Sequence, residues 1–199
     1  MSKKKIRVFI VGVGNCAKSL IQGVDYYIQN PEDSVGLMYK DIGGYGVKDI
    51  LFVGGADVDY RKAGHALIDA IYADPNCAMD HVEEVMYCIE EDAFVYFAPI
   101  LDGVAKHMAH YPAEVSFRPH NAFYTMDLPS AGAFVDVMRE LDVDVIINYA
   151  PVGSHQVTDF WIDVAIEAGC NFINCIPTLI DTKKAQEVEQ RFIDAGSIS

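Results

Sequence analysis

The sequence has little basic charge and no long apolar run. Only 15 of its 199 residues are Lys or Arg, against 29 Asp or Glu, so the formal net charge is −14 with His counted neutral. Nucleic acids and anionic membranes usually require a basic face, so we expect neither as a partner. The apolar run that begins at Ile6 is interrupted by glycine after six residues, too few for a signal peptide. No other window approaches the roughly 20 apolar residues of a membrane-spanning helix, and we expect a cytoplasmic protein.

The sequence also lacks the spacings that mark disulfide frameworks and zinc sites. Its five cysteines form an odd set without a CxxC pair, and its six histidines include no HExxH. His107 and His110 could share one face of a helix, but no third ligand accompanies them. We therefore expect free thiols in a reducing compartment, and no metal.

What is present is enough apolar material for a packed core. Hydrophobic residues make up 51% of the chain and charged residues 22%, with only 8 prolines, which is typical of a folded protein. At about 150 residues per domain, the length suits one α/β domain, or one domain with part of a second.

Short β-branched runs alternate with helical patterns along most of the chain. Such alternation predicts right-handed βαβ units and an α/β fold with a doubly wound parallel sheet. The expected strands are 6–11, 50–56, 94–98, 143–149 and 171–176, and the expected helices are 17–28, 61–71, 102–109, 131–141, 155–168 and 182–195. Ser130 and Ser154 are candidate N-caps, and Gly169 is a candidate left-handed C-cap.

Two stretches depart from this alternation. Residues 30–48 are polar and rich in glycine, which indicates a long loop. Residues 73–128 contain four prolines and an acidic patch, and we expect an irregular insert there. The fold prediction is thus one Rossmann-like domain over residues 1–199 with an insert at about 73–128.

The turn after the first strand carries a dinucleotide fingerprint, Gly12-x-Gly14-x-x-Ala17. In this pattern the first glycine permits a tight turn and the second lets the backbone approach a pyrophosphate. A strand precedes the pattern and a helix follows it, as the fingerprint requires. An ordinary tight turn is the alternative interpretation.

Asp57, at the end of the second strand, is the expected acidic partner of a ribose hydroxyl and would favour NAD over NADP. It lies 45 positions after Gly12 instead of about 20, because the loop 30–48 intervenes. The alternative role for Asp57 is a helix cap. Cys16 lies at a helix start, where a thiolate can be stabilised, but no base accompanies it, and we interpret it as a small residue lining the turn.

Five ordered motifs resemble the prokaryotic branch of the myo-inositol-1-phosphate synthase (inositol-3-phosphate synthase) family. That branch carries GVGNCASSL, FDVD, LDG, YLPVGS and FVNCIP in this order. The matching stretches here are 11–20, 57–59, 101–103, 148–154 and 174–177.

The resemblance implies an NAD-dependent isomerase of inositol biosynthesis, which converts glucose 6-phosphate to inositol 3-phosphate by oxidation, enolisation, aldol cyclisation and reduction. It implies that Gly12, Gly14, Asn15 and Cys16 hold the pyrophosphate, that Asp57 binds the adenine ribose, and that Tyr149, Pro151, Val152, Gly153 and Ser154 lie along the cofactor toward the nicotinamide. The family also assembles as an oligomer, so a homo-oligomer is a possible state.

One family motif has no match. The lysine-bearing GDDxKSQxGAT segment, which supplies charge to the reacting groups, is absent from these 199 residues. We therefore expect a chain truncated before its catalytic domain, which binds NAD but is inactive alone. The alternatives are a non-catalytic dinucleotide-binding module or subunit, and a different Rossmann dehydrogenase, which would need an acid or base near Ser154.

Overall fold

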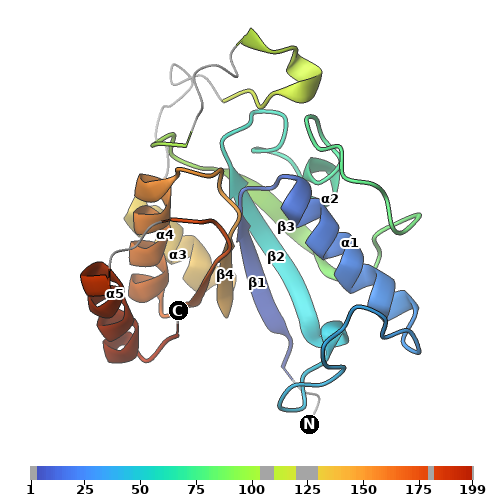
Figure 1. Cartoon of the computed structure of the whole chain (residues 1–199), viewed down its shortest axis with the longest axis horizontal. Coiled ribbons are helices and arrows are strands. Elements are labelled where there is room, and N and C mark those ends of the chain that lie inside the picture. Colours follow the sequence, from blue (N-terminus) through green and yellow to red (C-terminus); the bar gives the residue numbers. More distant parts are fainter. Residues whose placement is uncertain (1–3, 104–109, 120–129, 179–181, 199) are drawn as a thin grey trace.

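A computed structural model gives the structure of residues 4–103, 110–119, 130–178 and 182–198 (Figure 1). Its centre is a five-stranded sheet in the order β3-β2-β1-β4-β5, and every neighbouring pair is parallel. The strands are β1 (Ile6–Val11), β2 (Ile50–Asp57), β3 (Ile89–Phe97), β4 (Val145–Asn148) and β5 (Asn171–Asn174). The chain crosses from one edge of the sheet to the other side of β1 between β3 and β4, so β1 and β4 flank the switch point.

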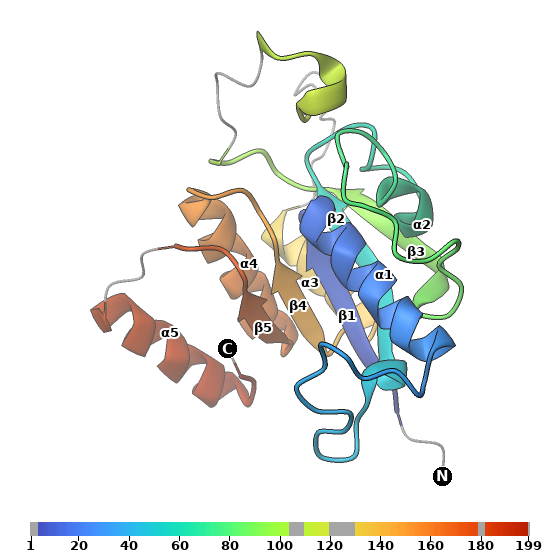
Figure 2. The same cartoon turned by 45° about the vertical axis from the view of Figure 1, so that its right-hand side comes forward.

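Helices cover both faces of the sheet, which confirms the predicted doubly wound α/β fold (Figures 1 and 2). Side chains of β1 alternate between two buried clusters. Val8 and Ile10 pack with α1 (Asn15–Gln29) and α2 (Leu67–Ala70). Phe9 and Val11 pack on the opposite face with α3 (Ala131–Glu140) and α4 (His155–Ala168). β1 is therefore buried from both sides, as its unbroken apolar sequence indicated.

The C-terminal helix α5 (Thr182–Ala195) extends the second layer. Phe192 is buried and stacks on Phe172 of β5, with ring centroids 6.5 Å apart. After the helix, the carbonyl of Ile198 accepts a hydrogen bond from the Phe172 N–H at 2.9 Å, so the chain returns to the edge of β5.

The helix expected over 61–71 is wrong for most of that range. Only Leu67–Ala70 is helical, because the chain before it pairs with β3 instead. The Gly64 N–H donates to the Val95 carbonyl at 2.8 Å, and the His65 carbonyl accepts from the Val95 N–H at 2.9 Å. Gly64 has a φ of +90°, which breaks the helical path.

β3 is longer than the strand expected over 94–98. The additional residues at its start include the acidic side chains of residues 90–92. They lie on an edge strand, where charged side chains can remain in solvent. Glu90 forms a bidentate pair with Arg7 of β1 at 2.9 and 2.6 Å. The loop over 30–48 is confirmed, ending in a short 3-10 helix, η1 (Val47–Asp49), and a second one, η3 (Ala113–Val115), lies in the insert. Residues 104–109 of the expected helix 102–109, with His107, lie outside the described residues.

Within the insert, residues 77–88 are held against one polar stripe of α1. Asn15 accepts from the backbone N–H groups of residues 77 and 78, at 2.7 and 2.8 Å. Further along the helix, Lys18 pairs with Asp80 at 2.8 Å. The buried Gln22 and Asp25 then accept from the N–H groups of residues 81, 86 and 87. This irregular segment is therefore fixed by side chains of a helix rather than by secondary structure of its own.

None of the helices in the described ranges is both long and apolar enough to cross a membrane.

Candidate functional site

A cleft of about 220 Å³ opens at the carboxyl edge of the sheet. It is lined by the residues that follow β1, β2, β3 and β4, and it lies at the switch point, where ligands of such sheets bind. Seven of the ten predicted site residues line it, namely Gly12, Gly14, Asn15, Asp57, Tyr149, Pro151 and Ser154. The structure therefore brings most of the predicted site residues together from the ends of three strands.

The remaining three predicted residues do not line this cleft. Cys16 is an exposed free thiol in the first turn of α1. Val152 is 74% exposed, and Gly153, with a φ of +92°, forms the turn before α4. Each of the three is adjacent in sequence to a residue that lines the cleft.

Gly12 makes the turn after β1 possible. Its φ is +83°, and a Cβ there would lie 2.8 Å from the Tyr149 carbonyl oxygen at the end of the neighbouring strand β4. Its N–H donates to the Ala56 carbonyl of β2 at 2.9 Å. Glycine is therefore required by the close approach of three strands at this point.

Gly14 has a different role, because nothing surrounds the place where its side chain would be. It is the N-cap of α1, no side chain caps the helix there, and a Cβ would meet no atom within 4 Å. The first N–H groups of a helix lack partners within the helix and carry its positive dipole end. The start of α1 thus offers backbone donors and open space to an anion in the cleft.

The side chain of Asn15 is bonded to the insert, which leaves its backbone N–H at the start of α1. Its carboxamide oxygen is committed to the N–H groups of Cys77 and Ala78. The side chain therefore links the turn to the insert, a contact between distant positions that the fingerprint does not encode.

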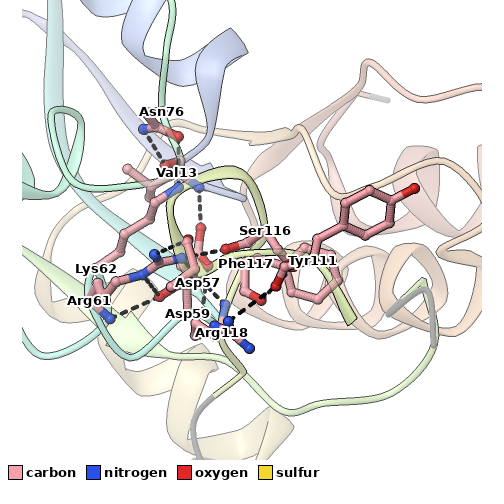
Figure 3. A network of polar contacts seen from close by, with 11 residues as sticks. Val13, Asp57, Asp59, Arg61, Lys62, Asn76, Tyr111, Ser116, Phe117 and Arg118 are labelled. Carbon is pink, nitrogen blue, oxygen red and sulfur yellow. Dashed lines mark hydrogen bonds and ion pairs between the residues drawn. The ribbon is translucent and has the colours of Figure 1, made fainter. Parts of the chain in front are cut away.

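Asp57 ties the glycine turn to the end of β2. One carboxylate oxygen accepts from the Val13 N–H at 2.7 Å and the other from the Asp59 N–H at 2.8 Å (Figure 3). A carboxylate has about four acceptor positions, so two remain for hydroxyl groups in the cleft. Burial raises the pKa of Asp57, and Lys62 together with the two N–H donors acts in the opposite direction. These two hydrogen bonds join the turn after β1 to the end of β2, so Asp57 does not have the alternative role of a helix cap.

Lys62 is a cleft residue that the sequence interpretation missed. It is only 4% exposed, and its Nζ donates to the Asn76 side-chain oxygen at 2.8 Å. Asn76 in turn donates to the Val13 carbonyl at 3.1 Å (Figure 3). Burial lowers the pKa of Lys62, while Asp57 and Asp59 act to raise it. The sequence signal for Lys62 is its position five residues after Asp57, the acidic residue that ends β2.

The predicted N-cap role of the Ser154 side chain is wrong. The carboxylate of Asp102 caps α4 instead, accepting from the N–H groups of Gln156 at 2.9 Å and Val157 at 3.2 Å. Ser154 is fully buried, and its Oγ has no hydrogen-bond partner among the described residues. An orphaned hydroxyl in the wall of a cleft is costly without a ligand or water to satisfy it. Gly103 is packed so closely that a side chain there would overlap Ser154 Oγ.

Tyr149 follows β4 on the same side of the cleft. Burial raises its pKa to about 12, with smaller contributions from Cys175 and Cys16. Its phenol therefore stays protonated at neutral pH and can donate a hydrogen bond. Tyr149 and Ser154 are the hydroxyl groups on the β4 side, opposite the Asp57 carboxylate on the β2 side.

Comparison with known proteins places this cleft in a wider context. No family model matches the chain. The inositol-3-phosphate synthase of Mycobacterium tuberculosis is 36% identical over 196 residues, which are 96% of this chain and 48% of the relative. The protein of the same name from Corynebacterium glutamicum is 39% identical over an alignment of 201 positions, which covers 98% of this chain and 50% of the relative. The chain is thus similar in sequence to proteins named inositol-3-phosphate synthase. It spans about half the length of the curated relatives it matches.

Two solved structures share the fold of this chain. The crystal structure of Ari2 has a TM-score of 0.72 and 26% identity over 97% of this chain and 51% of its own. A myo-inositol-1-phosphate synthase-related protein from Thermotoga maritima shares the fold, with a TM-score of 0.58 and 20% identity over 96% of this chain and 51% of its own.

The structure brings together two of the motifs that carried the resemblance. The LDG motif supplies Asp102, which caps α4, and Gly103, which packs on Ser154. The PVGS motif supplies Ser154 and the turn into the same helix. The two motifs therefore form one structural unit at the β4 side of the cleft, although about fifty positions separate them.

Proposed function

We propose that this chain binds NAD in the cleft and is the NAD-binding part of an inositol-3-phosphate synthase. The observation that carries the proposal is the open N-terminus of α1 at Gly14, which faces the same cleft as the Asp57 carboxylate. The sequence similarity to proteins named inositol-3-phosphate synthase supports it. In this proposal, residues 1–199 form one Rossmann-like domain.

The adenosine half of the cofactor would lie on the β2 side. The backbone N–H groups at the start of α1 would bind the pyrophosphate, and Asp57 would accept from the ribose hydroxyls with its two remaining acceptor positions. A 2′-phosphate would instead meet the Asp57 carboxylate. Charge repulsion there, in a half-buried site, makes NAD the expected cofactor and disfavours NADP.

The nicotinamide half would lie toward β4. The protonated phenol of Tyr149 and the orphaned hydroxyl of Ser154 are donors or acceptors for its ribose and carboxamide. Pro151, Val152 and Gly153 form the turn that would border it. When bound, NAD supplies a hydride acceptor that can return the hydride. The role of the chain is to bind and orient the cofactor.

The activity we propose for the whole enzyme is the conversion of glucose 6-phosphate to inositol 3-phosphate in the cytoplasm, by an assembly that can be a homo-oligomer. These 199 residues contain no match to the lysine-bearing family motif. We therefore propose that they bind NAD without turnover. A non-catalytic dinucleotide-binding subunit is the second candidate, and the same missing motif favours it.

Calorimetric titration of the 199-residue chain with NAD and NADP tests the binding proposal. We expect tighter binding of NAD, and a loss of that preference in Asp57→Ala. Asp136→Ala, which changes an exposed carboxylate on α3, is the matched control and should bind like the wild type. Unchanged NAD affinity in Asp57→Ala would overturn the ribose assignment.

A turnover assay tests the second part of the proposal. The chain is supplied with NAD and glucose 6-phosphate, and inositol phosphate is measured. We expect none from these 199 residues alone. Release of inositol phosphate would show that a complete catalytic site forms without the lysine motif.

A further inference from the structure

The wall of the cleft beside Asp57 contains an aromatic ring that comes from the insert. Building on the NAD-binding function proposed above, we propose that Phe117 is the stacking surface for the adenine ring and that Arg61 is the residue that positions it. Neither residue belongs to the fingerprint or to the motifs of the resemblance.

The segment that carries Phe117 is bound to the chain just after β2. Asp59 and Pro119 form an antiparallel bridge, and the Tyr60 N–H donates to the Arg118 carbonyl at 3.0 Å. The Arg118 N–H donates to the Asp59 carboxylate at 2.7 Å (Figure 3). Phe117 is therefore held between residues whose backbones are fixed to the end of β2.

Arg61 forms the second attachment. Its guanidinium donates to the carbonyls of Ala113 and Ser116, both at 2.7 Å, so it spans the turn that precedes Phe117. The same guanidinium contacts the Asp59 carboxylate through Nε at 2.9 Å and Nη2 at 2.5 Å. A planar guanidinium with these four contacts fixes the orientation of the segment better than a flexible ammonium would.

The ion pair at the centre of this attachment persists at neutral pH. Asp59 is fully buried. Burial alone would raise its pKa, but hydrogen bonds from Arg61 and from the Arg118 N–H outweigh burial and lower the pKa. Arg61 and Asp59 thus form a clamp that is in place before any ligand arrives.

Phe117 lines the cleft and is half-buried, so part of its ring is open to a ligand. It lies on the β2 side of the cleft, next to Arg118, whose N–H donates to the carboxylate of Asp59, two positions after Asp57. Val58 and Pro99 line the cleft with it. A base attached to a ribose that binds Asp57 must occupy this part of the cleft. An aromatic and apolar wall suits a flat purine, which presents a π-face to it.

Calorimetry with NAD and ADP-ribose tests the platform. We expect Phe117→Ala to weaken both ligands by about 10-fold, since stacking on one aromatic ring is worth about that factor. Because ADP-ribose lacks nicotinamide, an equal loss for both ligands assigns the effect to the adenosine half. Phe117→Trp should restore the affinity. Val115→Ala, in the same segment but 59% exposed, should bind like the wild type.

Proton NMR of bound ADP-ribose provides a readout that a loss of stability would not reproduce. Stacking on Phe117 should shift the adenine H2 and H8 resonances upfield, and Phe117→Ala should remove that shift. Arg61→Met should weaken ADP-ribose in the wild type but add little to Phe117→Ala, because both changes remove the same contact.

The outcomes separate the two proposals. If the wild type binds NAD but Phe117→Ala binds it equally well, the adenine platform is wrong and the NAD-binding function stands. If the wild type binds neither NAD nor ADP-ribose, the proposed function itself is wrong.

Discussion

The two glycines of the turn after β1 should respond in opposite ways to the same substitution. In Gly14→Ala, the new methyl group meets no protein atom within 4 Å, and the φ of −96° at this residue is accessible to alanine. The fold should therefore tolerate the change, and the smaller entropy of the unfolded chain could stabilise it by about 0.4–1 kcal/mol. The methyl group would, however, occupy the space that a pyrophosphate needs.

The magnitude follows from the hydrogen bonds that would be lost. A hydrogen bond to a charged group contributes about 1.5–3 kcal/mol. Displacing the pyrophosphate from even one backbone N–H should weaken NAD by at least about 10-fold. Calorimetry should thus show reduced affinity in a protein that melts at or above the wild-type temperature.

Gly12→Ala is the contrasting variant. Its Cβ would lie 2.8 Å from the Tyr149 carbonyl, at a φ of +83°. The left-handed conformation costs about 1–2 kcal/mol and the overpacking about 1–3 kcal/mol more. We expect a melting temperature lower by roughly 4–20 °C. If Gly14→Ala binds NAD like the wild type, the pyrophosphate does not lie at this turn and the argument fails.

Further predictions concern charges around the cleft. Affinity for NAD should fall as the pH is lowered, because Asp57 must be ionised to accept two hydroxyls, and burial should place the midpoint above the usual Asp pKa of about 3.9. Lys62→Met should move that midpoint to higher pH in the same calorimetric series, since Lys62 lowers the pKa of Asp57; an unchanged midpoint would contradict this coupling. Asp102→Ala should lower the stability by about 1 kcal/mol, or about 2–4 °C in a melting experiment, while Asp102→Asn keeps an acceptor and should lose less. Equal losses in the two Asp102 variants would refute the capping role.

The parts of the fold that depend on local sequence could be predicted. The strand before Gly12 and the helix after Gly14 have the expected bounds within two residues. Ser130 caps α3 by accepting from the Ala133 N–H at 3.2 Å, and Gly169 ends α4 with a φ of +81°. In each case the signal lies within one turn of the residue that it concerns.

The errors occur where a residue distant in the sequence determines the local structure. Ser154 has the residue type and position of an N-cap, but Asp102 reaches the same N–H groups from another strand end. Gly64 pairs with β3, which a helical pattern over 61–71 cannot reveal. The place of Lys62 in the cleft depends on its contact with Asn76 and on burial, which its neighbours in the sequence do not determine. Such contacts arise only once the chain has folded.

The central claim is that NAD lies across the carboxyl edge of the sheet with its pyrophosphate at the start of α1. A crystal structure of the chain with NAD tests it most directly. The account predicts pyrophosphate density within hydrogen-bond distance of the backbone N–H groups that follow Gly14, and ribose hydroxyls on Asp57. Dinucleotide density elsewhere, or a nucleotide whose phosphates avoid this turn, would contradict the account.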